Sequence, residues 1–260
     1  MASTALITGG TGLIGQAVLK GWTDPGLEPV PLDRSADDLL VPGTATAVVR
    51  RLRPAVVVHL AWVASGTPGY RGSADNERWL AATLELASAC TDNDALLFAT
   101  GSPLDREGAA ADAYSGAKSA LWQALLPAVS IGEIGWLRPF YVIDPDRRRP
   151  ALVNQAIAAR DAGHPLTLLT PESRHDFVHV DDVAAAVCAA ATHRLTGEVE
   201  IGSGRLRTVR ELVEALGVAW QAADPAPEGS PPHAHLPANV ARLVDLGWSP
   251  TTTEELFPGD

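Results

Sequence analysis

The sequence predicts an α/β fold: a doubly wound parallel sheet with a smaller appended lobe. Short apolar runs alternate with longer amphipathic segments through the first half of the chain, which is typical of strand–helix units. Two of these runs, residues 55–60 and 95–100, are almost continuously apolar, as strands covered on both faces are. The first run, at the N-terminus, leads directly into a glycine-rich turn and a helix.

The N-terminal strand, residues 5–8, is followed by three glycines at a spacing of three, Gly9, Gly12 and Gly15. Gly9 would let the chain turn sharply, Gly12 would let the backbone approach a pyrophosphate, and Gly15 would let the next helix pack close to the sheet. The N-terminus of that helix would present free N–H groups to phosphates. An ordinary glycine-rich turn is the alternative, but the position between strand and helix favours dinucleotide binding and a Rossmann-like fold.

The second predicted strand, residues 28–32, ends at an acidic and a basic residue. Asp33 lies 18 residues after the last of the three glycines, about where an acid accepts hydrogen bonds from the adenosine ribose of NAD. Arg34 could instead neutralise the 2′-phosphate of NADP, so both cofactors stay open. The polar segment that follows is too short for a full strand, and it would bring Asp38 and Leu39 beside the adenine.

Four further elements continue the alternation: helix 44–52, strand 55–60, helix 75–91 and strand 95–100. Strand 55–60 ends at Leu60 and is followed by Ala61 and Trp62, and a cofactor phosphate or ribose could pass beside these three residues. The inward face of helix 75–91 is predicted to include Leu80, Leu84, Leu86 and Ala87.

The predicted chemical centre is a tyrosine–lysine pair. Tyr114 and Lys118 are four residues apart, which puts both side chains on one face of a helix. A nearby ammonium is expected to lower the pKa of the phenol towards the working range, and Lys118 can also hold the nicotinamide ribose. A hydroxyl from the preceding strand end, Thr100 or Ser102, could bind the reacting oxygen while Tyr114 transfers the proton. An ordinary amphipathic helix is the alternative.

Composition limits the other classes of function. The net charge of −11 over 260 residues argues against nucleic acid as a partner. The longest apolar run is too short to span a bilayer, and no secretory signal precedes the first strand, so a cytoplasmic protein without a membrane partner is expected. Cys90 and Cys188 predict separate thiols rather than a disulfide framework. No metal is expected at the acidic and histidine residues His175, Asp176, His179 and Asp181.

These motifs resemble one family. The turn TGGTGLIG, the strand VVVHLAW, the strand end LFATGS and the helix start YSGAK are similar to those of the extended short-chain dehydrogenases/reductases, the NAD-dependent epimerase/dehydratase family. In the second half, LRPFYVIDP and RHDFVHVDDVAAAV resemble that family's segments. The shortened region after the second strand also resembles the branch of dTDP-4-keto-rhamnose reductases. The resemblance implies an NAD(P)-binding domain over residues 1–145 with returning segments near 175–202, a substrate lobe over 146–260, and a possible homodimer.

The resemblance also implies site residues. Tyr114, Lys118 and Thr100 match the catalytic positions, with Ser102 as the alternative hydroxyl. The cofactor, NADP or NAD, would be bound by Gly9, Thr11, Gly12, Leu13, Ile14, Gly15, Asp33, Arg34, Asp38, Leu39, Leu60, Ala61, Trp62, Tyr114, Lys118 and Pro139. The substrate would be bound by Ser102, Tyr141, Asn154 and Arg174, with Arg174 at the diphosphate. Tyr141 stands where relatives often carry Asn.

The strand end narrows the reaction. Dehydratases of the family carry an Asp-Glu pair directly after the catalytic threonine, whereas Gly101 and Ser102 stand here. The expected function is therefore an NAD(P)H-dependent ketoreductase acting at carbon 4 of a nucleotide-activated deoxysugar, with Tyr114 as proton donor. The alternatives are a nucleotide-sugar 4-epimerase, a reductase of another natural-product carbonyl, and a non-catalytic dinucleotide-sensing regulator.

Overall fold

The computed structural model describes residues 2–63, 67–106, 112–145, 152–224 and 236–257. The chain divides into two compact units. The first unit comprises Met1–Pro139 and Ala184–Glu200, and the second comprises Phe140–Val183 and Ile201–Asp260. Among the described residues, no helix combines the length and the apolarity needed to cross a membrane.

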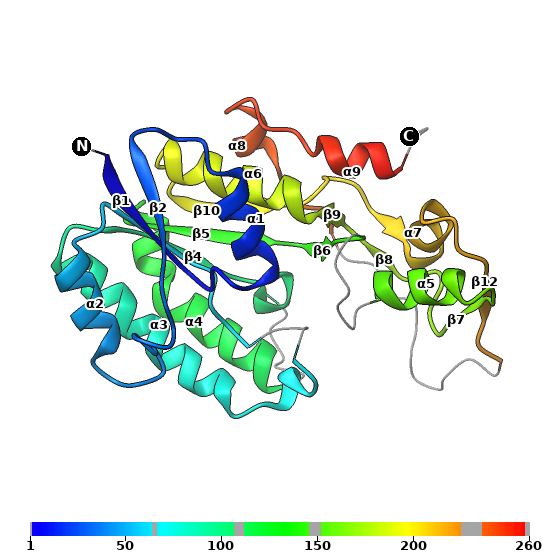
Figure 1. Ribbon diagram of the computed structural model, residues 1–260, viewed down its shortest axis with the longest axis horizontal. Coiled ribbons are helices and arrows are strands. Elements are labelled where there is room, and N and C mark those ends of the chain that lie inside the picture. The colour runs from blue at the N-terminus through cyan, green and yellow to red at the C-terminus, as the bar shows by residue number, and fades with distance from the viewer. Residues whose placement is uncertain (1, 64–66, 107–111, 146–151, 225–235, 258–260) are drawn as a thin grey trace. The chain divides into compact units, whose positions relative to one another are not determined.

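The first unit is built on a six-stranded sheet with the order β10-β5-β4-β3-β1-β2 (Figure 1). The strands are β1 Ser3–Thr8, β2 Leu27–Pro31, β3 Val56–His59, β4 Leu96–Thr100, β5 Ile134–Pro139 and β10 Gly197–Ile201. The pairs β1–β2, β1–β3, β3–β4 and β4–β5 are parallel. Because β2 and β3 lie on opposite sides of β1, the strand order reverses at β1, which is where such sheets bind ligands.

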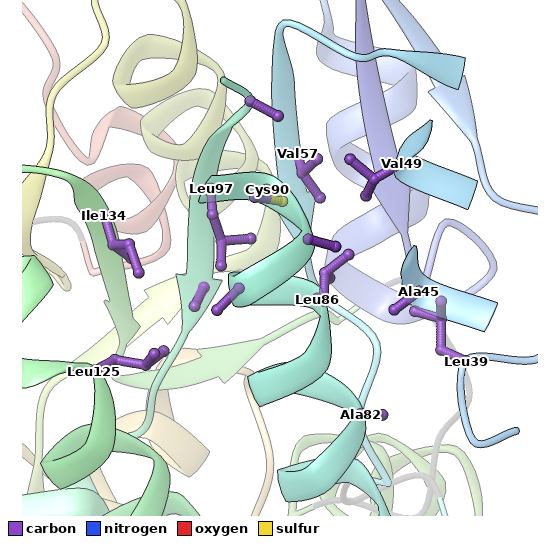
Figure 2. Close-up of a cluster of buried hydrophobic side chains, with 14 of the residues drawn as sticks. Leu39, Ala45, Val49, Val57, Ala82, Leu86, Cys90, Leu97, Leu125 and Ile134 are labelled. Carbon is purple, nitrogen blue, oxygen red and sulfur yellow. The ribbon is translucent and has the colours of Figure 1, made fainter. Parts of the chain in front are cut away.

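Helices cover both faces of this sheet. The helices are α1 Leu13–Gly21, α2 Thr44–Leu52, α3 Asp75–Asp92, α4 Ala113–Ser130 and α6 Val180–Thr192. Residues of α2, α3 and α4 pack with Val57, Leu97 and Ile134 of the sheet into one apolar core (Figure 2). On the other face lie α1 and α6, where the Cys188 Sγ approaches the Val18 carbonyl oxygen at 3.9 Å. The predicted doubly wound parallel sheet is therefore confirmed.

The inward face of α3 differs from the prediction at one position. Trp79, Ala82, Leu86 and Cys90 are buried at the helical spacing of three and four residues. Leu84 falls between these positions and is 36% exposed, so the prediction that it faces inward is wrong. The apolar composition of α3 is broader than its buried face, which is why the pattern alone misplaced this leucine.

The second unit has its own small core of apolar side chains, which includes Ile143, Val153, Phe177 and Leu212. Within the described part of this unit, the strands form three two-stranded sheets, β6–β9, β7–β12 and β8–β11. The elements are β6 Tyr141–Ile143, α5 Leu152–Asp161, β7 Leu166–Leu168, β8 Arg174–His175, β9 Phe177–His179, β11 Arg207–Thr208, α7 Val209–Ala215, β12 Trp220–Ala222, α8 Ala241–Val244 and α9 Thr251–Leu256.

Candidate active site

The glycine turn after β1 is formed as its sequence predicts. Gly9 has a φ of +71°, and a Cβ there would lie 2.7 Å from the Ala61 nitrogen. The Gly12 N–H donates to the Gly9 carbonyl oxygen at 2.8 Å, and a Cβ on Gly15 would overlap that same oxygen. Gly12 is the N-cap of α1 and has no side chain to occupy the first N–H groups of the helix. The N-terminus of α1 therefore has no side-chain cap, as is typical of helix termini that bind anions.

This turn forms part of a cavity of about 300 Å³ within the first unit. The ends of β1, β2 and β3 and the start of α3 contribute its walls. Nine of the predicted cofactor residues line it: Gly9, Thr11, Gly12, Asp33, Arg34, Leu39, Leu60, Ala61 and Trp62. Thr8, Gly10, Leu32, Asp37 and Trp79 also line it and were not predicted. Leu13, Ile14, Gly15, Asp38, Tyr114, Lys118 and Pro139 are not among the lining residues.

The charged end of this cavity holds Asp33 and Arg34. Asp33 Oδ1 accepts hydrogen bonds from the Ser35 hydroxyl at 2.7 Å and from the Ser35 N–H at 2.9 Å, and these bonds lower the pKa of Asp33. Arg34 Nε lies 3.4 Å from Asp38 Oδ1, and its guanidinium lies 5.9 Å from the centroid of the Trp79 ring. Asp33 is thus ionised and faces the cavity, while Arg34 already has a carboxylate partner.

A buried histidine joins the strand ends around the glycine turn. His59 Nε2 is 2.9 Å from Thr83 Oγ1, and Nδ1 is 2.7 Å from Thr8 Oγ1. Because the Thr83 hydroxyl donates to the Trp79 carbonyl oxygen, it must accept from Nε2–H, and Thr8 then donates to Nδ1. Burial, with a smaller effect of the Lys118 charge, lowers the pKa of His59 to about 3, so the ring is neutral.

Lys118 lies on α4 and is only 3% exposed. Its Nζ donates to the Thr100 carbonyl oxygen at 2.8 Å and lies 3.6 Å from the centroid of the Trp62 ring. Burial lowers the pKa of Lys118 to about 7, and the charge of Asp105 opposes that shift. The ammonium is therefore held by a carbonyl oxygen and an aromatic face, and the negative charge of Asp105 favours it.

Tyr114 lies one turn before Lys118, and its pKa shifts opposite to the sequence-based expectation. Burial raises the pKa of Tyr114 to about 12, while a hydrogen bond with the Ser102 side chain and the charge of Arg71 lower it. The expectation that Lys118 would lower this pKa is wrong, because desolvation of the phenolate outweighs nearby charges. Tyr114 is thus protonated, as a proton donor must be.

The two candidate hydroxyls face different partners. Thr100 Oγ1 donates to the His59 carbonyl oxygen at 2.7 Å, towards β3. Ser102 is buried, its Oγ accepts a hydrogen bond from the Leu104 N–H at 3.3 Å, and its side chain lowers the pKa of Tyr114. Of the two hydroxyls, that of Ser102 is the one that acts on the phenol. The sequence left the choice between Thr100 and Ser102 open, and the structure distinguishes the two by their partners.

The start of α4 is fixed by a capping box and an ion pair. Asp112 Oδ1 accepts from the Ser115 N–H at 2.8 Å, and Ser115 Oγ accepts from the Asp112 N–H at 3.1 Å. Arg71 pairs with the other Asp112 oxygen at 2.7 Å, and the neighbouring Tyr70 ring packs edge-on against Tyr114 at 5.3 Å between centroids. The Asp-x-x-Ser spacing is a signal that sequence inspection could have used to find this cap.

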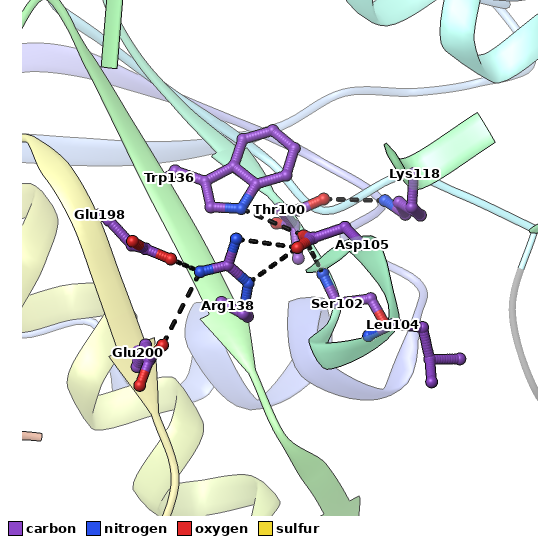
Figure 3. A network of polar contacts seen from close by, with 9 residues as sticks. All are labelled: Thr100, Ser102, Leu104, Asp105, Lys118, Trp136, Arg138, Glu198 and Glu200. Atoms are coloured by element: carbon purple, nitrogen blue, oxygen red, sulfur yellow. Dashed lines mark hydrogen bonds and ion pairs between the residues drawn. The ribbon is translucent and has the colours of Figure 1, made fainter. Parts of the chain in front are cut away.

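Beneath the strand end lies a buried ion pair between Asp105 and Arg138 (Figure 3). Neither side chain of the pair has any exposed surface. Asp105 lies in the 3₁₀ turn Pro103–Arg106 and Arg138 in β5, so 33 residues separate them. No local sequence pattern signals such a pair, and sequence inspection did not find it.

The predicted substrate residues of the second unit are found as follows. Tyr141 in β6 packs against the His175 ring at 4.1 Å between centroids. Asn154 is half-buried on α5, and Arg174 is exposed on β8. Within the described parts of the chain, no three His, Cys, Asp or Glu residues gather into a group that could hold a metal ion.

A parallel sheet with a glycine cradle at its switch point, followed by a Tyr–Lys helix, defines a dinucleotide-dependent oxidoreductase. The profile of the NAD dependent epimerase/dehydratase family matches residues 5–202, and the chain belongs to this family. The predicted enzyme class, an NAD(P)-dependent oxidoreductase, is confirmed at that level.

Three relatives illustrate the similarity. dTDP-6-deoxy-L-talose 4-dehydrogenase (NAD(P)(+)) of Kitasatospora kifunensis is 29% identical, covering 95% of this chain and 91% of that protein. dTDP-4-dehydrorhamnose reductase of Bacillus anthracis, solved with NADP, has a TM-score of 0.79 at 15% identity, covering 98% and 96%. UDP-glucose 4-epimerase of Thermus thermophilus, solved with NAD, has a TM-score of 0.69 at 24% identity, covering 95% and 94%.

Proposed function

We propose that this protein is an NAD(P)H-dependent ketoreductase that reduces the carbon-4 carbonyl of a nucleotide-activated deoxysugar. The observation that carries the proposal is the buried Ser102 side chain acting on the half-buried Tyr114, with Lys118 one turn along and no acid at position 101. The 29% identical relative is named for dehydrogenation at carbon 4 of a dTDP-6-deoxyhexose, and the reverse of that reaction is a 4-keto reduction.

The residues of the first unit fit a dinucleotide. The cradle at Gly9 and Gly15 has no room for a Cβ, the N-terminus of α1 has no side-chain cap, and Asp33 faces the cavity as a ribose acceptor. Thr11, Leu13, Ile14, Asp38, Leu39, Leu60 and Pro139 stay predicted contacts of the same cofactor. Reduced nicotinamide supplies the hydride in this chemistry.

Residues of this chain would supply the proton that the carbonyl oxygen accepts. Ser102 and Tyr114 donate hydrogen bonds to the carbonyl oxygen and polarise it, and Tyr114 then gives up its proton as that oxygen becomes an alkoxide. A phenol with a raised pKa stays protonated until the oxygen develops charge. Lys118 would bind the nicotinamide ribose. In the second unit, Arg174, Tyr141 and Asn154 are proposed to bind the nucleotide-sugar substrate.

The test is turnover of a dTDP-4-keto-6-deoxyhexose with NADPH or NADH, followed by the absorbance of the reduced nicotinamide. Stoichiometric cofactor oxidation and a 4-hydroxy product are expected. Interconversion of UDP-glucose and UDP-galactose without net cofactor oxidation would identify a 4-epimerase instead. A nucleoside diphosphate that binds the substrate site stabilises the protein by about 2.7 kcal/mol when its concentration is 100 times its Kd. If no nucleoside diphosphate stabilises the protein, the substrate is a carbonyl compound without a nucleotide.

Replacing the hydroxyls of Ser102 and Thr100 in turn shows which of them binds the reacting oxygen. Ser102→Ala is expected to lower kcat about 10²- to 10³-fold, the effect of removing one hydrogen-bond donor to a developing oxyanion. Thr100→Val is expected to cost about 1 kcal/mol of stability, since it loses the bond to His59, while kcat changes far less. Steady-state kinetics and thermal unfolding of both variants check this, and the reverse order of kcat losses would assign the role to Thr100.

Asp33 is proposed to favour NADH over NADPH. In Asp33→Ser, kcat/KM with NADPH relative to NADH is expected to rise on the order of tenfold, because a carboxylate facing the cavity repels a 2′-phosphate. The control is Asp37→Asn, whose carboxylate also lines the cavity but is already paired with Arg51 at 2.6 Å. An equal change in both variants would contradict a specific role for Asp33.

A further inference from the structure

Asp105 forms hydrogen bonds through both carboxylate oxygens. Oδ1 accepts two hydrogen bonds from Arg138, from Nε at 3.0 Å and from Nη2 at 2.8 Å. Oδ2 accepts from the Ser102 N–H at 3.0 Å and from Trp136 Nε1–H at 3.3 Å. One carboxylate thus joins β5 to the turn that carries the Ser102 hydroxyl (Figure 3).

The positive charge of Arg138 is also balanced by two carboxylates on the side away from Asp105. Its Nη1 pairs with Glu198 and lies 3.8 Å from Glu200, both on β10. Its guanidinium lies 4.8 Å from the centroid of the Trp122 ring. The cost of removing two charges from water can exceed their mutual attraction, so a buried ion pair is weak evidence for stability. A role other than stability is therefore sought for this pair.

The pair fixes the strand end that precedes the reacting hydroxyl. The Gly101 N–H donates to the Leu137 carbonyl oxygen at 2.7 Å, and a Cβ on Gly101 would lie 2.6 Å from Asp105 Oδ2. The backbone at Gly101 and Ser102 is therefore pressed against the carboxylate and the Trp136 indole. The Ser102 hydroxyl is held in the same turn, where its Oγ accepts from the Leu104 N–H at 3.3 Å and its side chain acts on the pKa of Tyr114.

Charge connects Asp105 to the other two members of the site. Its negative charge raises the pKa of Lys118 and also that of Tyr114. Among the described residues, the charged and titratable groups that act on Lys118 or on which it acts are Asp105 and the neutral His59, and those that act on Tyr114 are Asp105, Tyr70 and Arg71. Among these groups, Asp105 alone acts on both Lys118 and Tyr114.

We propose that Asp105, held by Arg138, is a positioning residue of the active site that fixes the backbone at Ser102 and places a buried negative charge on the side of the site where Tyr114 and Lys118 lie. This proposal rests on the proposed function in assigning Ser102, Tyr114 and Lys118 to the reaction. It adds a residue that touches none of the reacting atoms and acts through those three.

The experiment is Asp105→Asn in the full-length protein, with the titration of Lys118 followed by NMR of ¹³C-labelled lysine. The Lys118 signal is assigned by its loss in Lys118→Met. We expect the midpoint in Asp105→Asn to fall by roughly one pH unit, because the ammonium loses its counter-charge. A purely structural defect that admits water to the site would raise the midpoint instead, so the sign of the shift separates the two explanations.

The matched control is Asp182→Asn, which removes another buried carboxylate. Asp182 accepts from Thr253 N and Oγ1 at 2.6 and 2.5 Å, both in the second unit. We expect this variant to lose stability and leave the Lys118 midpoint unchanged. Should Asp105→Asn fail to fold, the double variant Asp105→Asn, Arg138→Gln removes both buried charges and is expected to lower the midpoint in the same direction. An unchanged or raised midpoint in the folded variant overturns the proposal.

Kinetics provides the second readout. The high-pH limb of kcat is expected to move to lower pH in Asp105→Asn, because both the phenol and the ammonium lose their protons more easily. A lower kcat with an unmoved limb would mean that Asp105 acts on geometry alone, and it would overturn the electrostatic part of the proposal. If no carbonyl compound is reduced by the unmodified protein, the proposed function fails, while the NMR titration still decides the role of Asp105.

Discussion

Tyr114→Phe is expected to reduce kcat by about 10²- to 10⁴-fold, because it removes the proton donor while keeping the ring. The dissociation constant for NADH or NADPH should change little, since Tyr114 is not among the residues that line the glycine cavity. Pre-steady-state kinetics with a keto-sugar nucleotide and fluorescence titration with the cofactor measure the two quantities separately.

The control for this variant is Tyr70→Phe. The Tyr70 ring packs edge-on against Tyr114, and phenylalanine keeps that contact. Its kcat should therefore fall far less than that of Tyr114→Phe. A Tyr114→Phe protein with full biological activity would contradict the catalytic role and would support the non-catalytic, dinucleotide-sensing alternative.

Arg138→Met is expected to destabilise the protein by about 3–5 kcal/mol, because it leaves the Asp105 carboxylate buried without its counter-charge. Asp105 would keep only the N–H groups of Ser102 and Trp136 as donors. Denaturant unfolding at neutral pH measures the loss, with the midpoint concentration falling and the slope unchanged.

Removing both charges should cost less than removing one. The double variant Asp105→Leu, Arg138→Met replaces the pair by apolar side chains and is expected to recover much of the stability lost in Arg138→Met. Recovered stability together with low activity is the expected combination, since Ser102 would no longer be held. If the double variant is no more stable than Arg138→Met, the loss comes from packing against Trp122 and not from charge.

The elements that the sequence predicted well are those whose signal is local. Helix 44–52 coincides with α2, and the continuous apolar runs at 55–60 and 95–100 contain β3 and β4. A period, a glycine spacing or a capping residue is visible within a few positions along the chain, and short-range geometry converts it directly into structure.

Features that depend on burial could not be predicted in this way. The rise in the Tyr114 pKa comes from desolvation by residues brought together in the fold, whereas the sequence displayed only the favourable charge of Lys118. The partners of Thr100 and Ser102 likewise depend on how β3 and α4 flank the end of β4. Trp79 lines the cavity because α3 begins beside it, whereas its spacing in the sequence is typical of an ordinary core residue.

Gly101 has a consequence for how this chain could change its chemistry. Family members that eliminate water carry an acidic side chain directly after the strand, and here any side chain would overlap the Trp136 indole and approach the Asp105 carboxylate. A single substitution therefore cannot convert the proposed reductase into a dehydratase, since Trp136 and Asp105 would have to change together with it. A change between the two activities would therefore require repacking around the Gly101 α-carbon.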